Sequence, residues 1–208
     1  YASMFGIKNN ALHLDCRTIE SKPYEINFKD HQLMLINTNV KHSLSDSAYN
    51  DRRSACEQVS ALLGIKALRD ATEADLEKII DKITPANYQK ALYIIQENTR
   101  TIKAAKAIED GDLETLGALI YQSHNGLSTQ YKVSCDELDF LVEQAKKNKH
   151  VLGARMMGGG FGGCTINLVA KKEAKNFAEV TSKAYKNKFN KDCSVYFIEL
   201  SEGTHIVK

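Results

Sequence analysis

A dense run of glycines is the first feature of the sequence that could take part in chemistry. Residues 155–169 read RMMGGGFGGCTINLV, and Gly158, Gly160 and Gly163 match the G-x-G-x-x-G pattern of dinucleotide-binding proteins. In those proteins a helix begins at the last glycine, because its N-terminus binds the pyrophosphate. Here CTINLV follows, which is rich in β-branched residues and predicts a strand. The run also lacks the Gly-Lys-Ser/Thr ending of a Walker loop, so neither nucleotide motif is predicted.

The number of glycines nevertheless exceeds what a simple turn requires. A hairpin between two buried strands needs one or two glycines, and each further one costs roughly 0.5–1 kcal/mol relative to alanine. Such a density is tolerable where another backbone or a ligand must come very close. Phe161, in the middle of the run, would anchor the turn by burying its ring. We therefore expect the turn to press against a partner, with a plain glycine-rich hairpin as the alternative.

Polar residues at a strand end and near a helix start are further candidates. Asn37, Thr38 and Asn39 follow the apolar run LMLI, so a buried strand would deliver them to a site at its end. Residues of these types also form turns, which explains them equally well. Arg52 and Arg53 are adjacent and would diverge by about 100° on a helix, so they cannot both face one ligand. We expect a structural salt bridge for one and a solvated charge for the other.

The composition excludes several classes of protein. The 208 residues are 43% apolar and 26% charged with a net charge of +2, so neither nucleic acid nor a membrane is an expected partner. No apolar run approaches the roughly 20 residues of a membrane span. The five cysteines are widely spaced and indicate reduced thiols in a cytoplasmic protein, and no metal-ligand spacing is present. The first residue is Tyr1 rather than Met, which indicates a piece of a longer chain.

Strands are predicted near both ends of the chain, around a helical middle. Apolar and β-branched runs place them at residues 11–17, 33–40, 151–156, 164–170 and 193–199. The polar stretch with Pro23 between the first two is interpreted as a connection. Helices are expected at residues 45–63, over most of 72–150 and at 171–189. This order predicts an α+β fold in which helices cover one face of an antiparallel sheet.

Capping residues predict where the helices begin and end. Gly64 should end the first long helix, and Thr72 with Asp75 resembles a capping box. Pro85 should begin a long helix that Gly111 ends. The apolar stripes expected to be buried are Ala55, Cys56, Val59, Leu62 and Leu63 in the first helix and Tyr88, Leu92, Ile95, Ile102 and Ile108 in the long one.

Other polar residues receive structural interpretations. The helix after Gly111 is expected to end near His124, which would then pack at a helix end. Ser134 is expected to cap the next helix. Asp15 and Arg17 are predicted to form an ion pair at the end of a strand.

Four blocks of the sequence, in order, resemble one protein family. RMMGGGFGGCTINLV resembles the third glycine motif of the GHMP small-molecule kinases, in the Gly-Gly-Phe-Gly-Gly-Cys form of the galactokinases. LDCR (14–17), NTNVKHSLSDSAYNDRR (37–53) and EDGDLETLGALIYQSHNGLSTQYKVSCDELD (109–139) resemble further galactokinase blocks. The resemblance covers essentially the whole chain. It implies a GHMP kinase C-terminal domain at residues 28–208, with a ferredoxin-like antiparallel sheet and a large helical insertion, after a tail of the N-terminal domain at 1–27.

The resemblance also implies an activity, the ATP-dependent phosphorylation of galactose to galactose 1-phosphate with Mg²⁺. Galactokinases carry their Gly-Glu-His sugar motif and their ATP phosphate loop upstream of the residues matched here. Their catalytic aspartate lies in a Met-Asp-Gln segment and would fall two residues before Tyr1. No catalytic residue and no metal ligand is therefore expected in this chain, which should be inactive alone. The expected partners are galactose, ATP and an intramolecular N-terminal kinase domain, in a monomer.

Individual site residues follow from the same resemblance. Tyr49 matches the tyrosine with which galactokinases contact the sugar, although its spacing to Cys56 also fits a core tyrosine. Asn37, Thr38 and Asn39 would line the same pocket. Met157 replaces a threonine of many galactokinases, so a hydroxyl contact to phosphate is in doubt there. The glycine motif expected to support the upstream ATP phosphate loop consists of Gly158, Gly159, Gly160, Phe161, Gly162 and Gly163.

Two alternative functions remain open at this point. Some galactokinase-like proteins are regulators that respond to sugar and ATP without catalysis. A GHMP kinase for another sugar, such as an N-acetylated hexosamine, would carry a similar domain.

Overall fold

The computed structural model describes residues 1–40 and 45–205, and of residues 45–49 it describes the backbone alone. A four-stranded antiparallel sheet forms the centre of the fold, in the order β4-β5-β3-β6. Its strands are β3 (His31–Asn37), β4 (Val151–Met156), β5 (Cys164–Ala170) and β6 (Ser194–Ile198). The predictions at 151–156 and 164–170 are confirmed residue for residue, and the predicted α+β class with an antiparallel sheet is confirmed as well.

Strand β3 ends earlier than the predicted strand 33–40. It stops at Asn37, because Asn39 adopts a left-handed conformation with φ of 56° and so ends the extended run. Asn37 lies opposite Cys164 in the pairing with β5. The end of β3 therefore lies beside the residue that follows the glycine run.

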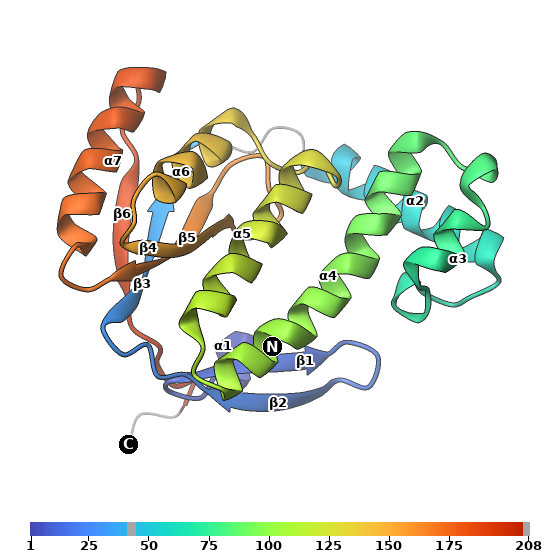
Figure 1. Ribbon diagram of the computed structural model, residues 1–208, viewed down its shortest axis with the longest axis horizontal. Helices are drawn as coiled ribbons and strands as arrows, with labels where there is room; N and C mark the ends of the chain where they lie inside the picture. Colours follow the sequence, from blue (N-terminus) through green and yellow to red (C-terminus); the bar gives the residue numbers. More distant parts are fainter. Residues whose placement is uncertain (41–44, 206–208) are drawn as a thin grey trace.

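Helices cover both faces of the four-stranded sheet (Figure 1). On one face lie α6 (Asp136–Lys146) and α7 (Ala174–Phe189), with side chains such as Met34, Leu141 and Phe177 between them and the sheet. On the other face α5 (Leu113–Thr129) packs against β4 and β5, beside α4 (Pro85–Glu109). The sequence predicted helices on one face only. This is corrected because Leu113 and Leu116 of α5 pack on Leu168 of β5.

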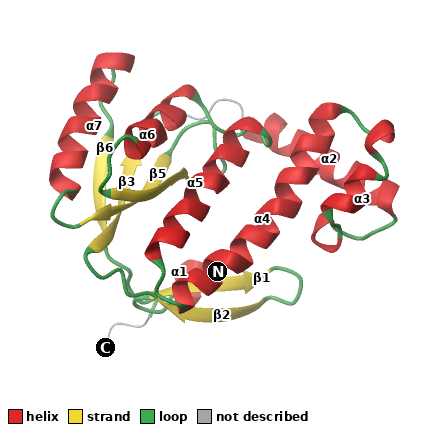
Figure 2. Ribbon diagram, viewed as in Figure 1, coloured by secondary structure: helices red, strands yellow, loops and turns green. Residues whose placement is uncertain are grey.

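A second, two-stranded sheet lies near the N-terminus, where the predicted strand at 11–17 is present as residues 10–15 and the second strand was missed. The sheet pairs β1 (Asn10–Asp15) with β2 (Glu20–Glu25) and follows the short helix α1 (Ala2–Phe5). Pro23 lies inside β2, opposite Leu12. Proline is tolerated there because each strand of a two-stranded sheet is an edge strand and has one side free of ladder hydrogen bonds. Figure 2 shows this pair apart from the larger sheet, at one end of α4.

Ion pairs join this hairpin to the helical part of the chain. Asp15 accepts two hydrogen bonds from Arg69, at 2.6 and 2.8 Å, and Arg17 pairs with Asp70 at 2.7 Å. Arg69 and Asp70 belong to the 3₁₀ helix η1 (Leu68–Asp70). The predicted ion pair of Asp15 with Arg17 is therefore wrong. The hydrogen bonds from Arg69 hold the pKa of the Asp15 carboxyl well below its usual range.

The two ends of the described chain lie side by side. The amide of Gly203 donates to the carbonyl oxygen of Gly6 at 2.8 Å, and that of Thr204 donates to Ser3 at 2.7 Å. The division of the chain into residues 1–27 and 28–208 stays a prediction.

The helical corner of the molecule contains α2 (Ser45–Leu63), α3 (Glu73–Glu77) and the 3₁₀ helix η2 (Ile80–Lys82). Gly64 follows α2 with φ of 67°, and Thr72 and Asp75 form the predicted capping box. Two members of the predicted buried stripes are exposed, Leu62 at 43% and Ile102 at 63%. The predicted stripes were too wide at these two positions, because the cluster shared by α2 and α4 includes neither side chain.

Helix α5 continues beyond its predicted end. It runs to Thr129, so His124 lies inside the helix and does not pack at its end. The helix continues through Gly126. A Cβ at this position would lie 2.5 Å from a carbon of the Tyr93 ring, so glycine leaves room for that ring. Among the residues described, no helix is long and apolar enough to span a membrane.

The contact between α5 and β4 generates a first testable prediction. A Cβ on Gly117 would lie 2.2 Å from the carbonyl oxygen of Leu152, so Gly117→Ala must push the helix off the strand. We expect it to lower the free energy of unfolding by roughly 1–3 kcal/mol, measured by urea denaturation. Ala118→Leu adds more volume on the exposed side of α5 and should change that free energy by less than about 0.5 kcal/mol. Equal stabilities of Gly117→Ala and wild type would contradict this packing.

Candidate functional site at the glycine turn

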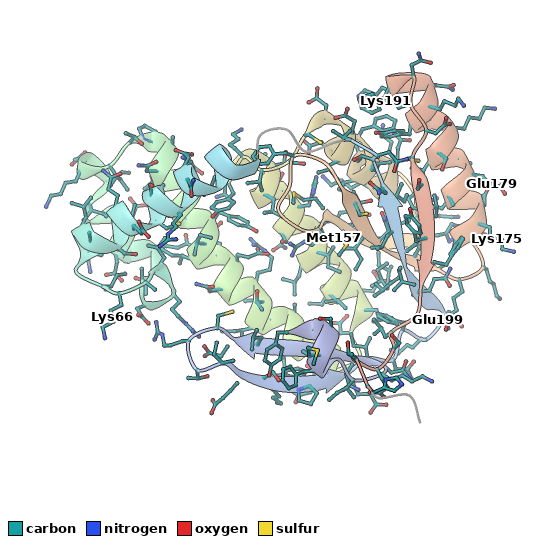
Figure 3. The ribbon with its side chains drawn as sticks, turned by 180° about the vertical axis from the view of Figure 1, so that it is seen from behind. Lys66, Met157, Lys175, Glu179, Lys191 and Glu199 are labelled. Atoms are coloured by element: carbon teal, nitrogen blue, oxygen red, sulfur yellow. The ribbon has the colours of Figure 1, made fainter. Side chains whose placement is uncertain are left out.

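The glycine run forms the turn between β4 and β5, so the predicted strand on each side of it is confirmed. The amide of Met157 donates to the carbonyl oxygen of Cys164 at 2.9 Å, and the chain then leaves the ladder. Residues 157–159 are exposed, whereas Gly160 and Gly162 are buried. Figure 3 marks Met157 where the turn leaves β4. We call residues 157–159 the exposed half of the turn and residues 160–163 its inner half.

Contacts within the chain explain the glycines of the inner half. Gly160 has φ of 90°, and a Cβ there would lie 2.0 Å from the carbonyl oxygen of Val133. Gly162 has φ of 140°, and a Cβ there would lie 3.0 Å from the carbonyl oxygen of Val40. The predicted close approach of another backbone therefore exists, but at these two glycines the backbone belongs to this chain. An upstream loop is not needed to explain them.

The glycines of the exposed half are different. A Cβ on Gly158 or Gly159 would meet no atom within 4 Å. Gly158 has a left-handed φ of 82°, which favours glycine. Gly159 has neither a left-handed φ nor a close neighbour, so nothing among the described residues requires glycine there. Gly159 is therefore the glycine of the turn that contacts within the described residues leave unexplained.

Phe161 anchors the turn, although its ring is partly buried rather than buried as predicted. Its side chain packs against a cluster that includes Val133, Leu138 and Met156. Its amide donates to the carbonyl oxygen of Val133 at 2.8 Å. Its backbone has φ of 60°, which is uncommon for a bulky residue and requires support from the surroundings.

The polar residues after β3 hold the turn in place. Thr38 is fully buried, and its amide and hydroxyl both donate to the carbonyl oxygen of Gly163 at 2.9 Å. Asn37 accepts the amide of Asn39, whose side chain donates to the carbonyl oxygen of Asp192 at 3.0 Å. The predicted sugar contact of Asn37, Thr38 and Asn39 stays a prediction. Thr38 has no exposed surface to offer a ligand in this arrangement.

The side chain of Tyr49 lies outside what the structure describes, and its backbone lies in α2. Its predicted role therefore stays a prediction. Nearby on α2, the side chain of Arg53 is 66% exposed and pairs with Glu57, whereas that of Arg52 is 13% exposed. Arg52 donates to the carbonyl oxygens of Tyr131, at 3.2 Å, and Lys132, at 2.5 Å.

The predicted salt bridge is present, since the guanidinium of Arg52 lies 3.5 Å from the carboxylate of Asp51 and that of the exposed Arg53 lies 2.8 Å from Glu57. The hydrogen bonds of Arg52 to two backbone carbonyls were not predicted. Only the divergence of Arg52 and Arg53 on a helix hinted at different roles for the two. Tyr131 lies 79 residues after Arg52 in the chain, and no local sequence pattern predicts a contact between them.

Comparison with known proteins places this geometry in a family. The family model described as "GHMP kinases C terminal" matches residues 104–187. Over 98% of its length the chain is 38% identical to a galactokinase of Thermotoga neapolitana and 39% identical to one of Lactobacillus helveticus. The structure matches that of Lactococcus lactis galactokinase complexed with galactose at a TM-score of 0.89, with 33% identity over 96% of the chain. Residues 104–187 of the chain carry a GHMP kinase C-terminal domain.

The chain is shorter than the proteins it resembles. It spans 57% of the Thermotoga neapolitana protein, 54% of the Lactobacillus helveticus protein and 53% of the Lactococcus lactis chain. A mevalonate kinase of L. major shares the fold at a TM-score of 0.56 and 20% identity. The predicted α+β GHMP kinase fold and the predicted resemblance to galactokinases are confirmed.

A buried hydrogen-bond network supports the end of β4 in this GHMP kinase domain. His124 is 3% exposed, and its Nδ1 accepts the amide of Met156 at 3.1 Å. Its Nε2 lies 3.2 Å from the carboxylate of Asp139, which also accepts hydrogen bonds from Ser134 and Ser128. The predicted helix cap at Ser134 is therefore wrong, because this hydroxyl bonds to Asp139. Met156 immediately precedes the turn, so the network fixes where the turn starts.

The carboxyl of Asp139 stays ionised in this network. Partial burial by itself raises its pKa, but the hydrogen bonds from His124, Ser134 and Ser128 outweigh burial and hold the pKa below its usual range. An ionised carboxylate can accept from all three groups at once.

The described residues were compared with the ligand groups that hold metal ions in proteins. No three His, Cys, Asp or Glu side chains among these residues are grouped so that they could hold a metal ion.

The two kinds of glycine in the turn generate a second prediction. Gly160→Ala places a Cβ against the Val133 carbonyl at a left-handed φ, and should lower the free energy of unfolding by at least about 2 kcal/mol. Gly159→Ala is the matched control and should change it by less than about 0.5 kcal/mol. Urea unfolding of the 208-residue chain measures both. Equal losses would mean that the turn is not held as described.

The pH dependence of stability gives a third prediction, tested with Asp139→Asn. Because the folded-state pKa of Asp139 is lowered, its carboxylate stabilises the fold above the unfolded-state pKa of about 4. That stabilisation disappears as the pH falls through the folded-state pKa. Asp139→Asn should lower the Tm at neutral pH and flatten the loss of Tm between about pH 5 and pH 2. The control variant Asp136→Asn changes an exposed carboxylate of the same helix and should keep the wild-type dependence of Tm on pH. The same dependence in Asp139→Asn would contradict the network.

Proposed function

We propose that this chain is the C-terminal part of a galactokinase, which transfers the γ-phosphoryl group of ATP to galactose and forms galactose 1-phosphate. The observation that carries the proposal is the similarity to Lactococcus lactis galactokinase complexed with galactose, over 96% of the chain at a TM-score of 0.89. Because the chain spans 53% of that protein, the activity is proposed for a longer protein. That protein would act in the cytoplasm as a monomer.

The sugar side of the proposed site is formed by α2 and the end of β3. The hydroxyl of Tyr49 would contact galactose, because this residue matches the sugar-contacting tyrosine of galactokinases. Asn37 and Asn39 would border the same pocket, where they already order the turn after β3. Thr38 would act indirectly, because its hydrogen bonds to Gly163 hold the sugar side against the glycine turn.

The nucleotide side of the proposed site is the exposed half of the glycine turn. Bare backbone at Gly158 and Gly159 allows another loop to approach closely, since no Cβ is in the way. The partner would be the ATP phosphate loop of the upstream domain, and ATP supplies the phosphoryl group when it is bound. Gly159 supports this proposal most directly, because no contact within the described residues explains it.

The chemical contribution of this chain would be positioning. Phosphoryl transfer depends on holding the attacking hydroxyl and the phosphoryl group in line. Tyr49 would orient the sugar, and the glycine turn would keep the phosphate loop in its shape. The catalytic carboxylate would be supplied by the segment upstream of Tyr1.

An exposed apolar patch near the N-terminus suits an additional domain. Tyr1, Met4, Phe5 and Ile7 are 43%, 60%, 58% and 42% exposed. Apolar side chains gathered on a surface in this way are typical of an interface. We infer that the upstream domain packs on this patch, which the hydrogen bond from Gly203 to Gly6 joins to the C-terminal residues.

A fourth prediction tests the proposed function. We expect no galactose-dependent ATP turnover from the 208-residue chain, and turnover from a longer protein that adds an upstream half like that of its relatives. In the longer protein Tyr49→Phe should raise the KM for galactose by about 3- to 10-fold, the worth of one hydrogen bond. A coupled assay of ADP release measures both.

The control variant is Tyr88→Phe, which removes a hydroxyl that bonds Glu77 in the helical corner and should leave this KM unchanged. An unchanged KM in Tyr49→Phe would refute the role of Tyr49. Turnover by the short chain would refute the need for an upstream half. Sugar and ATP binding without turnover in the longer protein would identify a regulator, and turnover with another sugar alone would identify a different GHMP kinase.

A further inference from the structure

Arg52 connects two parts of the proposed site that are distant in sequence. Its Nε donates to the carbonyl oxygen of Tyr131 and its Nη2 to that of Lys132. The guanidinium carbon also lies 5.6 Å from the centroid of the Phe161 ring, in the glycine turn. The side chain of Arg52 is 13% exposed, and its hydrogen bond to Tyr131 is partly buried, where such a bond is stronger than on the surface.

The segment that Arg52 holds is the one that supports the inner half of the turn. Val133 follows directly, and its carbonyl oxygen accepts the amide of Phe161 at 2.8 Å. The same oxygen would lie 2.0 Å from a Cβ on Gly160. A shift of residues 131–133 would therefore move the turn with it.

Two backbone conformations at this contact depend on support from their surroundings. Lys132 has φ of 58° and Phe161 has φ of 60°, both in the left-handed region that residues with a Cβ rarely adopt. Such conformations persist where several contacts hold them, and they cluster at functional sites. Arg52 contacts both residues, through the carbonyl of one and the ring of the other.

Helix α2 is itself firmly held, so it can act as the fixed reference. Val59 packs in a core cluster with Ala91 and Ile95 of α4. Asp51 pairs with Lys90 of α4 at 2.7 Å, and the side chain of Lys90 is 10% exposed. A group attached to α2 therefore keeps its position relative to α4.

We propose that Arg52 is a positioning residue that fixes the glycine turn relative to α2, so that the sugar side and the nucleotide side of the site keep one geometry. Tyr49 precedes Arg52 by three residues, which is close to one helical turn. The residue proposed to contact galactose and the residue that holds the turn thus share a single rigid element. The consequence for catalysis rests on the proposed function, whereas the consequence for the turn does not.

Amide hydrogen exchange of the 208-residue chain tests the structural part of the proposal. In Arg52→Ala and Arg52→Lys we expect the amide of Phe161 to exchange at least about 10-fold faster than in wild type, because its acceptor is no longer held. Lysine keeps the charge but cannot bond two carbonyls with a planar fork, so it should not rescue. Arg53→Ala removes the exposed neighbouring arginine and should leave the exchange unchanged. Wild-type exchange in Arg52→Lys would overturn the proposal, and this variant decides if Arg52→Ala does not fold.

Kinetics of the longer protein test the catalytic part. We expect Arg52→Lys to lower kcat/KM by about 10- to 100-fold and to raise the KM for both galactose and ATP, although Arg52 touches neither. A residue that only stabilised the fold would reduce the amount of active protein and leave both KM values unchanged, and that result would overturn the catalytic role. If the wild-type longer protein does not phosphorylate galactose, the proposed function fails, and hydrogen exchange alone then decides on Arg52.

Discussion

The carbonyl oxygen of Val133 accepts the amide of Phe161 and lies so close to Gly160 that no Cβ fits between them. This contact joins the loop before α6 to the turn between β4 and β5, two segments that no strand pairing connects. It requires a glycine on one side and a left-handed Phe161 beside it. Thr38 holds the far end of the same turn through Gly163. Together these contacts turn one half of the glycine run inward and leave residues 157–159 facing outward.

The surroundings of the turn make it rigid, which suits a part that positions other groups. The network of His124 and Asp139 fixes the last residue of β4, and Arg52 holds the loop that contains the Val133 carbonyl. Positioning residues work best when their own geometry is held by packing and hydrogen bonds. An exposed and bare backbone on a rigid support is what a second loop needs as a platform. The proposed contact with an upstream phosphate loop depends on this rigid, exposed backbone.

The fold was predictable from sequence where local patterns decide it. The strands at 151–156 and 164–170, the capping box at Thr72 and the end of α2 at Gly64 all depend on neighbouring residues. Strand β2 was missed because Pro23 is a poor strand residue. The segment becomes a strand through its pairing with β1. Burial failed as a prediction at Ile102, because periodicity alone does not tell how wide a face the neighbouring helix covers.

The candidate site divides in the same way. By itself the sequence determined the strand-turn-strand setting of the glycine run and its resemblance to the GHMP kinases, because both reside in contiguous motifs. Tertiary structure decided that the carbonyl of Val133 requires glycine at position 160, whereas no contact among the described residues requires it at position 159. It also decided that Arg52, unlike Arg53, reaches the loop beneath the turn. These distinctions join residues that lie tens of positions apart in the chain. Neighbouring glycines and neighbouring arginines look alike in sequence, and they differ only in what the folded chain brings against them.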